Sequence, residues 1–77
     1  MRVKNDDKGL TEIQRRLREE IKNSGLTQRE IAEAIGVSAQ TISRYMCDDV
    51  FPALDTLARL CLFLDISADY ILGIKSE

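Results

Sequence analysis

Residues 26–46 read LTQREIAEAIGVSAQTISRYM and hold two short helical patterns that meet at one glycine. The first pattern opens with Thr27 and Glu30, spaced as a capping box in which each side chain accepts a hydrogen bond from the other residue's amide. Gly36 predicts the end of this helix, because glycine adopts the left-handed conformation of a helix C-terminus without a Cβ penalty. Ser38 is a good N-cap and predicts the start of the second helix. Two short helices joined by so tight a turn are expected to cross steeply.

Each of the two helical patterns has one narrow apolar face. Ile31, Ala32 and Ile35 form this face in the first pattern, and Ile42 and Tyr45 form it in the second. Two helices that cross steeply need one position where their backbones approach closely, and the small side chain of Ala32 provides it. The two faces are therefore expected to pack together as part of a core.

The outer face of the second helix, over residues 39–46, is short and polar. Its side chains, none of them a carboxylate, are Ala39, Gln40, Thr41, Ser43 and Arg44. A solvated helix face is usually richer in charged residues such as glutamate and lysine. This composition favours a face that contacts another molecule.

The stretch described above is similar to the helix-turn-helix of the Cro and phage-repressor (Xre-like) DNA-binding family. The similarity continues through PALDTL at residues 52–57 and ISADYILG at residues 66–73, so it covers about residues 10–74. It implies an all-α fold, a compact five-helix bundle of the phage-repressor DNA-binding type, whose second and third helices form the helix-turn-helix. Residues 1–9 lack an apolar period and are expected to form a flexible amino-terminal arm, either disordered or in contact with DNA, and residues 75–77 a carboxy-terminal tail.

The resemblance also implies a function, that of a sequence-specific DNA-binding transcriptional regulator of prokaryotic or phage type, with repression as the expected activity. Its third helix would enter the major groove of double-stranded DNA. Ala39, Gln40 and Arg44 match the positions that read bases in the family. The Gln40 amide suits adenine N6 and N7, the Arg44 guanidinium suits guanine O6 and N7, and Ala39 suits a thymine methyl group. Phosphate contacts are expected from polar side chains at the helix starts and beside the reading positions: Gln28, Ser38, Thr41 and Ser43.

A first helix is expected to begin at Thr11, which is spaced from Gln14 as a capping box, and to run to about Asn23. Its buried stripe recurs every four residues and consists of Ile13, Leu17 and Ile21. The helix also carries charges that are interpreted as solvated and paired locally with glutamates, among them Arg15, Arg16 and Arg18.

The fourth expected helix, residues 54–64, is apolar almost all round. Its core face is expected to consist of Leu54, Leu57, Cys61 and Leu64, with further apolar side chains at Leu60, Leu62 and Phe63. A small domain has too little material to surround such a helix, so a partner or the ends of the chain must cover it. The resemblance implies a homodimer on a palindromic operator, because one small domain buries little DNA surface. The expected dimer interface consists of apolar residues of the fourth helix, the fifth helix and the residues that follow Gly73: Leu62, Phe63, Ile71 and Ile74.

The caps of the last two helices differ in quality. Ala53 precedes the fourth helix at a place where relatives tend to carry a capping serine, so the start of this helix is expected to be weakly capped. Ser67 is a good N-cap for the fifth helix, and Gly73 predicts its end.

The charge distribution favours DNA binding through one face only. Residues 1–25 carry seven basic and five acidic side chains, residues 26–46 carry two of each, and residues 47–77 carry two basic and six acidic ones. Asp48 and Asp49 stand where the family commonly has a glycine and basic residues near the DNA backbone, and they would repel phosphate. The acidic end favours an alternative function, a helix-turn-helix module that binds a protein, such as an anti-repressor or antitoxin-type partner, with weak or no DNA binding.

Two cysteines and no histidine argue against several kinds of site. Structural zinc needs four cysteine or histidine ligands and a catalytic thiol needs a base, so Cys47 and Cys61 are interpreted as ordinary reduced thiols. No metal, cofactor, small-molecule ligand or enzymatic activity is therefore expected. The sequence has no apolar run long enough to cross a bilayer and no secretory hydrophobic region near its start, so a cytoplasmic location is expected.

Overall fold

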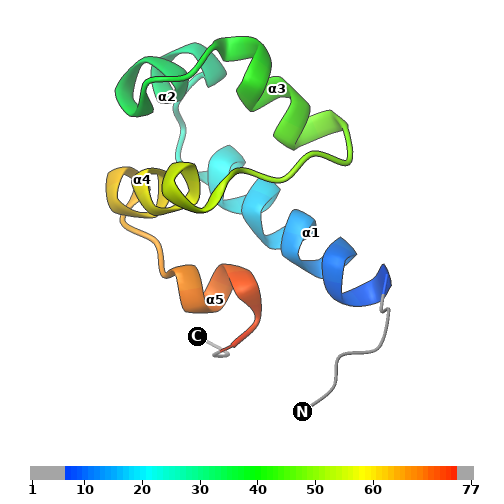
Figure 1. The fold of residues 1–77 in the computed structure, drawn as a ribbon. Helices are drawn as coiled ribbons and strands as arrows, with labels where there is room; N and C mark the ends of the chain where they lie inside the picture. The colour runs from blue at the N-terminus through cyan, green and yellow to red at the C-terminus, as the bar shows by residue number, and fades with distance from the viewer. Residues whose placement is uncertain (1–6, 75–77) are drawn as a thin grey trace.

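The computed structural model describes residues 7–74, with side chains from residue 11 onward. Within these residues every regular element is an α-helix: α1 (Asp7–Asn23), α2 (Gln28–Ile35), α3 (Ala39–Cys47), α4 (Leu54–Leu64) and α5 (Ala68–Leu72). In Figure 1, α2 and α3 lie on one side of the long α1 and α5 lies on the other, with α4 between α2 and α5. The structure confirms the all-α, five-helix fold that the sequence predicts.

Every helix contributes to one core. α1 packs against α3 and α5, α2 packs against α3 and α4, and α4 packs against α5. The apolar faces predicted for α2 and α3 are confirmed, since Ala32, Ile35 and Tyr45 are buried. Four large side chains at the centre of the core are fully buried: Ile31, Ile42, Leu60 and Ile71.

The first helix begins at Asp7, one turn before its predicted start at Thr11. Residues 7–9 therefore belong to α1 and not to the predicted flexible arm, which corrects that boundary. The rest of the predicted arm, residues 1–6, and the predicted tail, residues 75–77, lie outside the described residues.

The buried face of α4 differs from the prediction. Leu54, which was expected in the core, is 83% exposed, and Leu60, which was not, is fully buried. Leu54 is the first residue of the helix and projects from its first turn, whereas Leu57, Leu60 and Cys61, at i, i+3 and i+4, share the face that lines the core. Ala53 makes no side-chain capping hydrogen bond, which confirms the weak cap.

Candidate nucleic-acid interface

The turn that joins α2 to α3 is fixed by local hydrogen bonds. At the start of α2, the Glu30 amide donates to Thr27 Oγ1 at 3.0 Å and the Thr27 amide donates to Glu30 Oε1 at 2.8 Å, which confirms the capping box. At its end, Gly36 adopts φ 81° and its amide donates to the Ala32 carbonyl at 2.9 Å. Apart from its chain neighbours, no atom lies within 4 Å of where a Cβ would stand, so the left-handed backbone alone favours glycine here.

The start of α3 is held by Ser38, which confirms its predicted role as an N-cap. Its Oγ accepts from the Thr41 amide at 3.1 Å and lies 2.8 Å from the Thr41 hydroxyl in a second hydrogen bond. Each hydroxyl carries one proton, and the bond between them uses one of the two. Only one of these hydroxyls is therefore left to donate to a phosphate while the pair is intact.

The outer face of α3 is turned to solvent. Ala39, Gln40 and Arg44 are exposed, and Thr41 and Ser43 are half-buried. Neither Gln40 nor Arg44 makes a side-chain hydrogen bond or an ion pair with another residue that the structure describes. The three predicted base-reading side chains therefore share one free surface.

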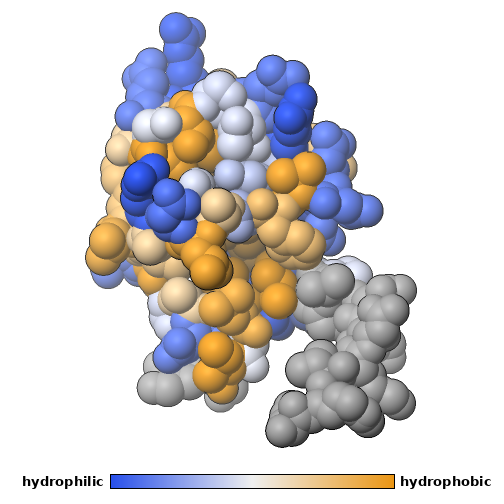
Figure 2. Space-filling view, in the orientation of Figure 1, coloured by the Kyte–Doolittle hydropathy of each residue, from blue (hydrophilic) through white to orange (hydrophobic). Residues whose placement is uncertain are grey.

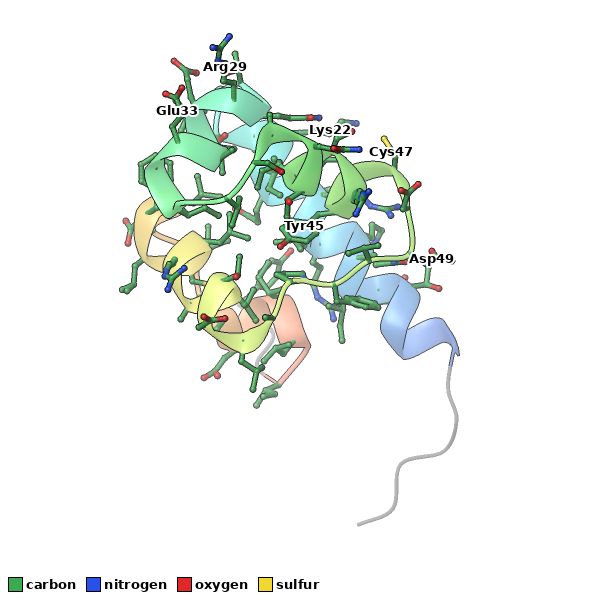
Figure 3. The ribbon with its side chains drawn as sticks, turned by 45° about the horizontal axis from the view of Figure 1, so that its top comes forward. Lys22, Arg29, Glu33, Tyr45, Cys47 and Asp49 are labelled. Atoms are coloured by element: carbon green, nitrogen blue, oxygen red, sulfur yellow. The ribbon has the colours of Figure 1, made fainter. Side chains whose placement is uncertain are left out.

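Tyr45 marks the inner face of α3. It points from the helix into the core in Figure 3 and is 5% exposed, which confirms its predicted packing role. Burial raises the pKa of its hydroxyl, and the negative charge of Asp55 adds to this effect. The hydroxyl therefore stays neutral at physiological pH, and Tyr45 anchors α3 to the core.

Arg18 of α1 holds the end of α3, a role that the sequence analysis missed. Its Nε donates to the Tyr45 carbonyl at 2.8 Å and its Nη2 donates to the Asp48 carbonyl at 2.9 Å. The interpretation as a solvated charge is wrong for Arg18. Arg16 forms its predicted pair with Glu12, at 3.8 Å, but it is not solvated, since its Nε donates to the Ile71 carbonyl at 3.0 Å. One sequence feature could have indicated this role of Arg18: no glycine follows α3. A helix that ends without a left-handed cap needs a donor from elsewhere to bond its last carbonyls.

Two carboxylates follow α3 directly. Asp48 and Asp49 are exposed, and Gln14 Nε2 donates to Asp49 Oδ1 at 3.3 Å. A neutral amide does not cancel the charge, and neither carboxylate forms an ion pair with the described part of the chain. A negative patch therefore adjoins the carboxy-terminal end of α3, where Figure 3 shows Asp49.

Metal, thiol and membrane-spanning sites each set requirements that the described residues would have to meet. No three histidine, cysteine, aspartate or glutamate side chains among them are grouped so as to hold a metal ion. Cys47 is exposed and Cys61 is buried, both as free thiols, and burial raises the pKa of the Cys61 thiol. None of the five helices, as described, has the length and apolar character to cross a membrane.

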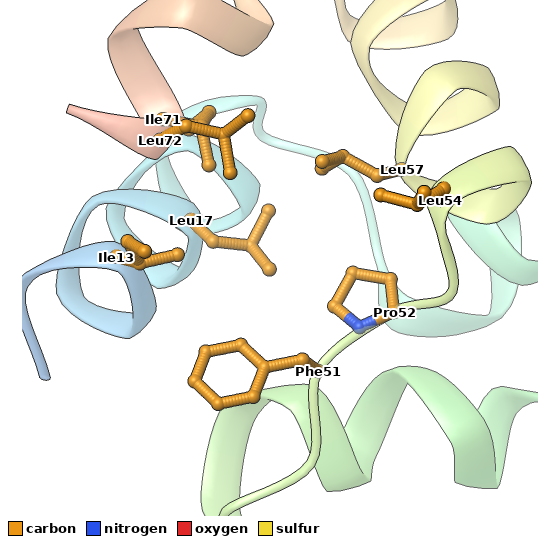
Figure 4. Close-up of a pocket in the computed structure, with 8 residues that line it drawn as sticks. All are labelled: Ile13, Leu17, Phe51, Pro52, Leu54, Leu57, Ile71 and Leu72. Carbon is orange, nitrogen blue, oxygen red and sulfur yellow. The ribbon is translucent and has the colours of Figure 1, made fainter. Parts of the chain in front are cut away.

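A second exposed surface is apolar and involves α4, α5 and the loop that leads into α4. Figure 2 shows hydrophobic side chains gathered over the middle and lower part of one face, with hydrophilic ones around its edges. An apolar pocket of about 210 Å³ opens between α1, this loop, α4 and α5 (Figure 4). Phe51, Leu54 and Leu72 line it and are also exposed to solvent.

The structure divides the predicted dimer interface. Leu62 and Ile74 are 83% and 69% exposed, and Phe63 is exposed as well, so all three are free to contact a partner. Ile71 is fully buried on the inward side of α5, and the prediction is wrong for this residue because a second copy cannot reach it. Phe51, Leu54 and Leu72, which lie outside that prediction, are further exposed apolar residues on this surface.

A capped helix, a left-handed glycine turn and a second helix with a free polar face define the helix-turn-helix class of protein. The profile of a family described as helix-turn-helix matches residues 17–71. The chain belongs to this family, which confirms its resemblance to the Cro and phage-repressor (Xre-like) type. Proteins of this type are DNA-binding transcription regulators and not enzymes.

Two proteins of Bacillus subtilis (strain 168) are similar to most of the chain. The uncharacterised HTH-type transcriptional regulator YobD is 37% identical over 62 residues, which are 80% of this chain and 55% of YobD. The HTH-type transcriptional regulator ImmR is 37% identical over 59 residues, which are 77% of this chain and 46% of ImmR. The chain thus spans about half the length of these relatives. No solved structure matches it significantly.

Proposed function

We propose that the chain is a sequence-specific DNA-binding transcriptional regulator, and specifically a repressor, that places α3 in the major groove. One observation supports this above all others. Gln40 and Arg44 project from a helix that is held at both ends, and they have no side-chain partner among the described residues. Free polar groups on a rigid helix are suited to bind base edges. Because such a regulator acts on a prokaryotic or phage genome, the proposal includes a cytoplasmic location.

Three side chains of α3 would read bases. The Gln40 amide both donates and accepts, as adenine N6 and N7 require, and the Arg44 fork donates twice, as guanine O6 and N7 require. Ala39, in the first turn, would pack against a thymine methyl group. The Ser38 cap fixes the orientation of this first turn. Because Ala39 and Arg44 lie more than one turn apart along α3, they would contact different base pairs.

Phosphate groups would be held around these reading positions. Gln28 is exposed at the first position of α2, beside backbone amides that have no acceptor within the helix. The hydroxyl that the Ser38–Thr41 pair leaves free would donate to a second phosphate. Ser43 is half-buried and would contribute at the edge of the interface.

A homodimer would bring two copies of α3 to a palindromic operator. A single module of this size buries only about 600–1,000 Å² on DNA, and a two-fold dimer with reading helices about 34–36 Å apart doubles that contact. We propose that the exposed apolar residues of the α4–α5 end form the contact between copies. Leu62, Phe63 and Ile74 remain candidates, and Leu54 and Leu72 join them because they line one apolar pocket.

Selection of bound duplexes from a random pool tests the DNA-reading proposal. We expect a palindromic site, with one guanine per half-site whose preference falls about 5- to 150-fold in Arg44→Ala, as loss of a bidentate contact requires. Arg59→Ala is the matched control, because Arg59 is an exposed arginine of α4 and its loss changes the net charge equally. If Arg44→Ala weakens every sequence to the same degree, Arg44 binds phosphate and does not read a base.

Sedimentation velocity over a range of concentrations tests the dimer. We expect a concentration-dependent dimer that is weakened by Leu62→Glu, by Leu54→Glu, or by both. The variant with the larger effect identifies the part of the apolar surface at the two-fold axis. A wild-type protein that stays monomeric at high micromolar concentration, with and without DNA, contradicts the dimer.

A second function has one specific observation in its favour. The carboxylates of Asp48 and Asp49, which form no ion pair among the described residues, adjoin α3 and oppose binding to phosphate. In this function α3 would instead contact a protein partner such as an anti-repressor or an antitoxin-type protein. Gel shift with random duplex DNA at low salt separates the two functions, since the regulator binds nonspecifically there and the interaction module does not.

A further inference from the structure

The two ends of α3 are held by unrelated devices. Its start is capped by its own neighbour Ser38, whereas its end lacks a left-handed cap, since Asp48 has φ −111° and ψ 172°. The last carbonyls of a helix have no donor within it. In α3 the Asp48 amide donates to the Arg44 carbonyl at 2.8 Å, and α1 supplies the further donors through Arg18.

The Arg18 guanidinium bridges two carbonyls that lie on either side of the helix end. One belongs to Tyr45, inside the last turn, and the other to Asp48, just after it. Both bonds are shorter than 3.0 Å, and the planar guanidinium fixes the direction of each donor. A positive charge at this place also interacts favourably with the negative end of the helix dipole. The last turn of α3 is therefore fixed to α1 as well as by its own bond from the Asp48 amide to the Arg44 carbonyl.

The residue that depends most on this last turn is Arg44. It directly precedes Tyr45, and its own carbonyl closes the turn. Gln40 lies one turn earlier, within the part that Ser38 and Thr41 hold. Movement at the carboxy-terminal end of α3 would therefore shift the Arg44 side chain against the bases and leave Gln40 in place.

We infer that Arg18 is a positioning residue for base readout, which sets the place of Arg44 by bridging the Tyr45 and Asp48 carbonyls and does not itself contact DNA. This inference rests on the proposed function. It assigns a part of the sequence preference to a side chain of α1, outside the helix-turn-helix.

A matched pair of variants tests the inference. Arg18→Met removes the bridge to α3, and Arg16→Met removes a similar bond from the same helix to the Ile71 carbonyl of α5. Each variant loses one positive charge. Arg18→Met loses two guanidinium–carbonyl bonds, and Arg16→Met loses one such bond and the ion pair with Glu12, but only Arg18 bonds the end of α3. Duplex selection and binding should be measured where urea titration shows both variants fully folded.

The expected result depends on position within the half-site. Arg18→Met should lower the preference at the base read by Arg44 by about fivefold or more, and leave the preference at the base read by Gln40 within about twofold. Arg16→Met should leave both unchanged. Arg18→Lys keeps the charge but not the fork, so it should restore the preference only in part.

Salt dependence and amide exchange distinguish the positioning of α3 by Arg18 from a direct contact of Arg18 with phosphate. Since Arg18 is inferred not to touch phosphate, Arg18→Met should keep the wild-type salt slope, whereas loss of a phosphate contact would lower it by about 0.9. Without DNA, Arg18→Met should speed exchange of the Asp48 amide, and Arg16→Met should not.

Three results would overturn the inference: an equal loss at every base, a reduced salt slope, or full recovery with Arg18→Lys. A wild-type protein that selects no sequence would instead overturn the proposed function. In that case the amide-exchange result would still report whether Arg18 holds α3.

Discussion

The α2–α3 part of the molecule and the α4–α5 part expose opposite kinds of side chain. In α2 and α3 the large apolar residues are buried except for the half-buried Met46, and the exposed positions carry polar residues, alanine or Cys47. α4 and α5 also contribute buried residues, such as Leu60 and Ile71, but Leu54 and Leu62 of α4 and Ile74, just after α5, project into solvent. Figure 2 shows this contrast on one face of the molecule.

The caps of the helices follow the same division. α2 starts with a reciprocal capping box and ends at a glycine in the left-handed conformation. α4 starts at Ala53 without a side-chain cap and ends at Asp65, a residue other than glycine with φ 57°. Local sequence therefore determines both ends of α2 and the start of α3, whereas α4 lacks such caps and depends on packing.

The largest expected effect is the loss of stability when a buried apolar residue, and not an exposed one, is truncated. Ile42→Ala removes a fully buried side chain of α3 and should lower the free energy of unfolding by about 2–5 kcal/mol. Leu62→Ala removes an exposed side chain of α4 and should change it by less than about 0.5 kcal/mol in the monomer. Urea denaturation at low protein concentration measures both.

Protein concentration sharpens this first comparison. The loss in Ile42→Ala should be the same at every concentration, because the core belongs to one chain. The loss in Leu62→Ala should grow with concentration if Leu62 lies at a dimer contact, because association stabilises the folded state by mass action. A concentration-independent loss above 2 kcal/mol for Leu62→Ala would contradict its exposed position.

Substitutions at the carboxy-terminal ends of α2 and α4 should change the free energy of unfolding in opposite directions. Gly36→Ala forces a Cβ into the left-handed conformation and should cost about 1–2 kcal/mol. Asp65→Gly removes that penalty at the end of α4 and should stabilise the protein by up to about 1 kcal/mol. Thermal and urea unfolding should agree on both signs, and a stabilised Gly36→Ala would show that the turn is not fixed by its backbone conformation.

Substitutions at the N-caps of the same two helices should change the stability by smaller amounts. Thr27→Ala removes the capping box of α2 and should cost about 1 kcal/mol. Ala53→Ser supplies a cap to α4, where the backbone already has the extended conformation of an N-cap, and should add about 0.5–1 kcal/mol. Equal effects of the same sign would mean that the two starts do not differ as the structure indicates.

Sequence reasoning succeeds where a residue acts on its near neighbours in the chain. The capping box of Thr27, the left-handed turn at Gly36 and the N-cap at Ser38 each depend on residues within four positions, and all three are confirmed. The free polar face of α3 follows from the same local periodicity. These elements determine the turn and the candidate interface.

Sequence reasoning fails where the partner of a residue is distant in the chain. Arg18 bonds carbonyls 27 and 30 residues away, and no local pattern distinguishes it from Arg15, which pairs with Glu19 as predicted and also with Glu12. Leu54 has the spacing of a core residue, but it is the first residue of α4 and projects from the first turn into solvent. The spacing of apolar residues predicts which side chains share a face of a helix. It does not predict which face is covered by the rest of the chain.

The smallest expected effect concerns the exposed ion pairs of α1, a helix that contacts both parts of the molecule. A hydrogen bond from Arg15 lowers the pKa of the Glu12 carboxyl below 4.5, and the positive charges of Arg15 and Arg16 add to this effect. A carboxyl whose pKa is lowered by folding contributes stability above its unfolded-state pKa and loses it as the pH falls through the folded-state pKa. Glu12→Gln should therefore lower the urea midpoint slightly at pH 7, with a difference that shrinks below pH 4.5.

Salt and a matched variant test the cause of that small effect. The difference between Glu12→Gln and wild type should fall in 1 M NaCl, because both partners are exposed and salt screens them. Glu33→Gln is the control, since Glu33 lies 3.7 Å from Arg29 in an exposed pair of α2 and should change the midpoint less. A Glu12→Gln difference that persists at low pH and at high salt would mean that packing of the side chain, and not its charge, stabilises α1.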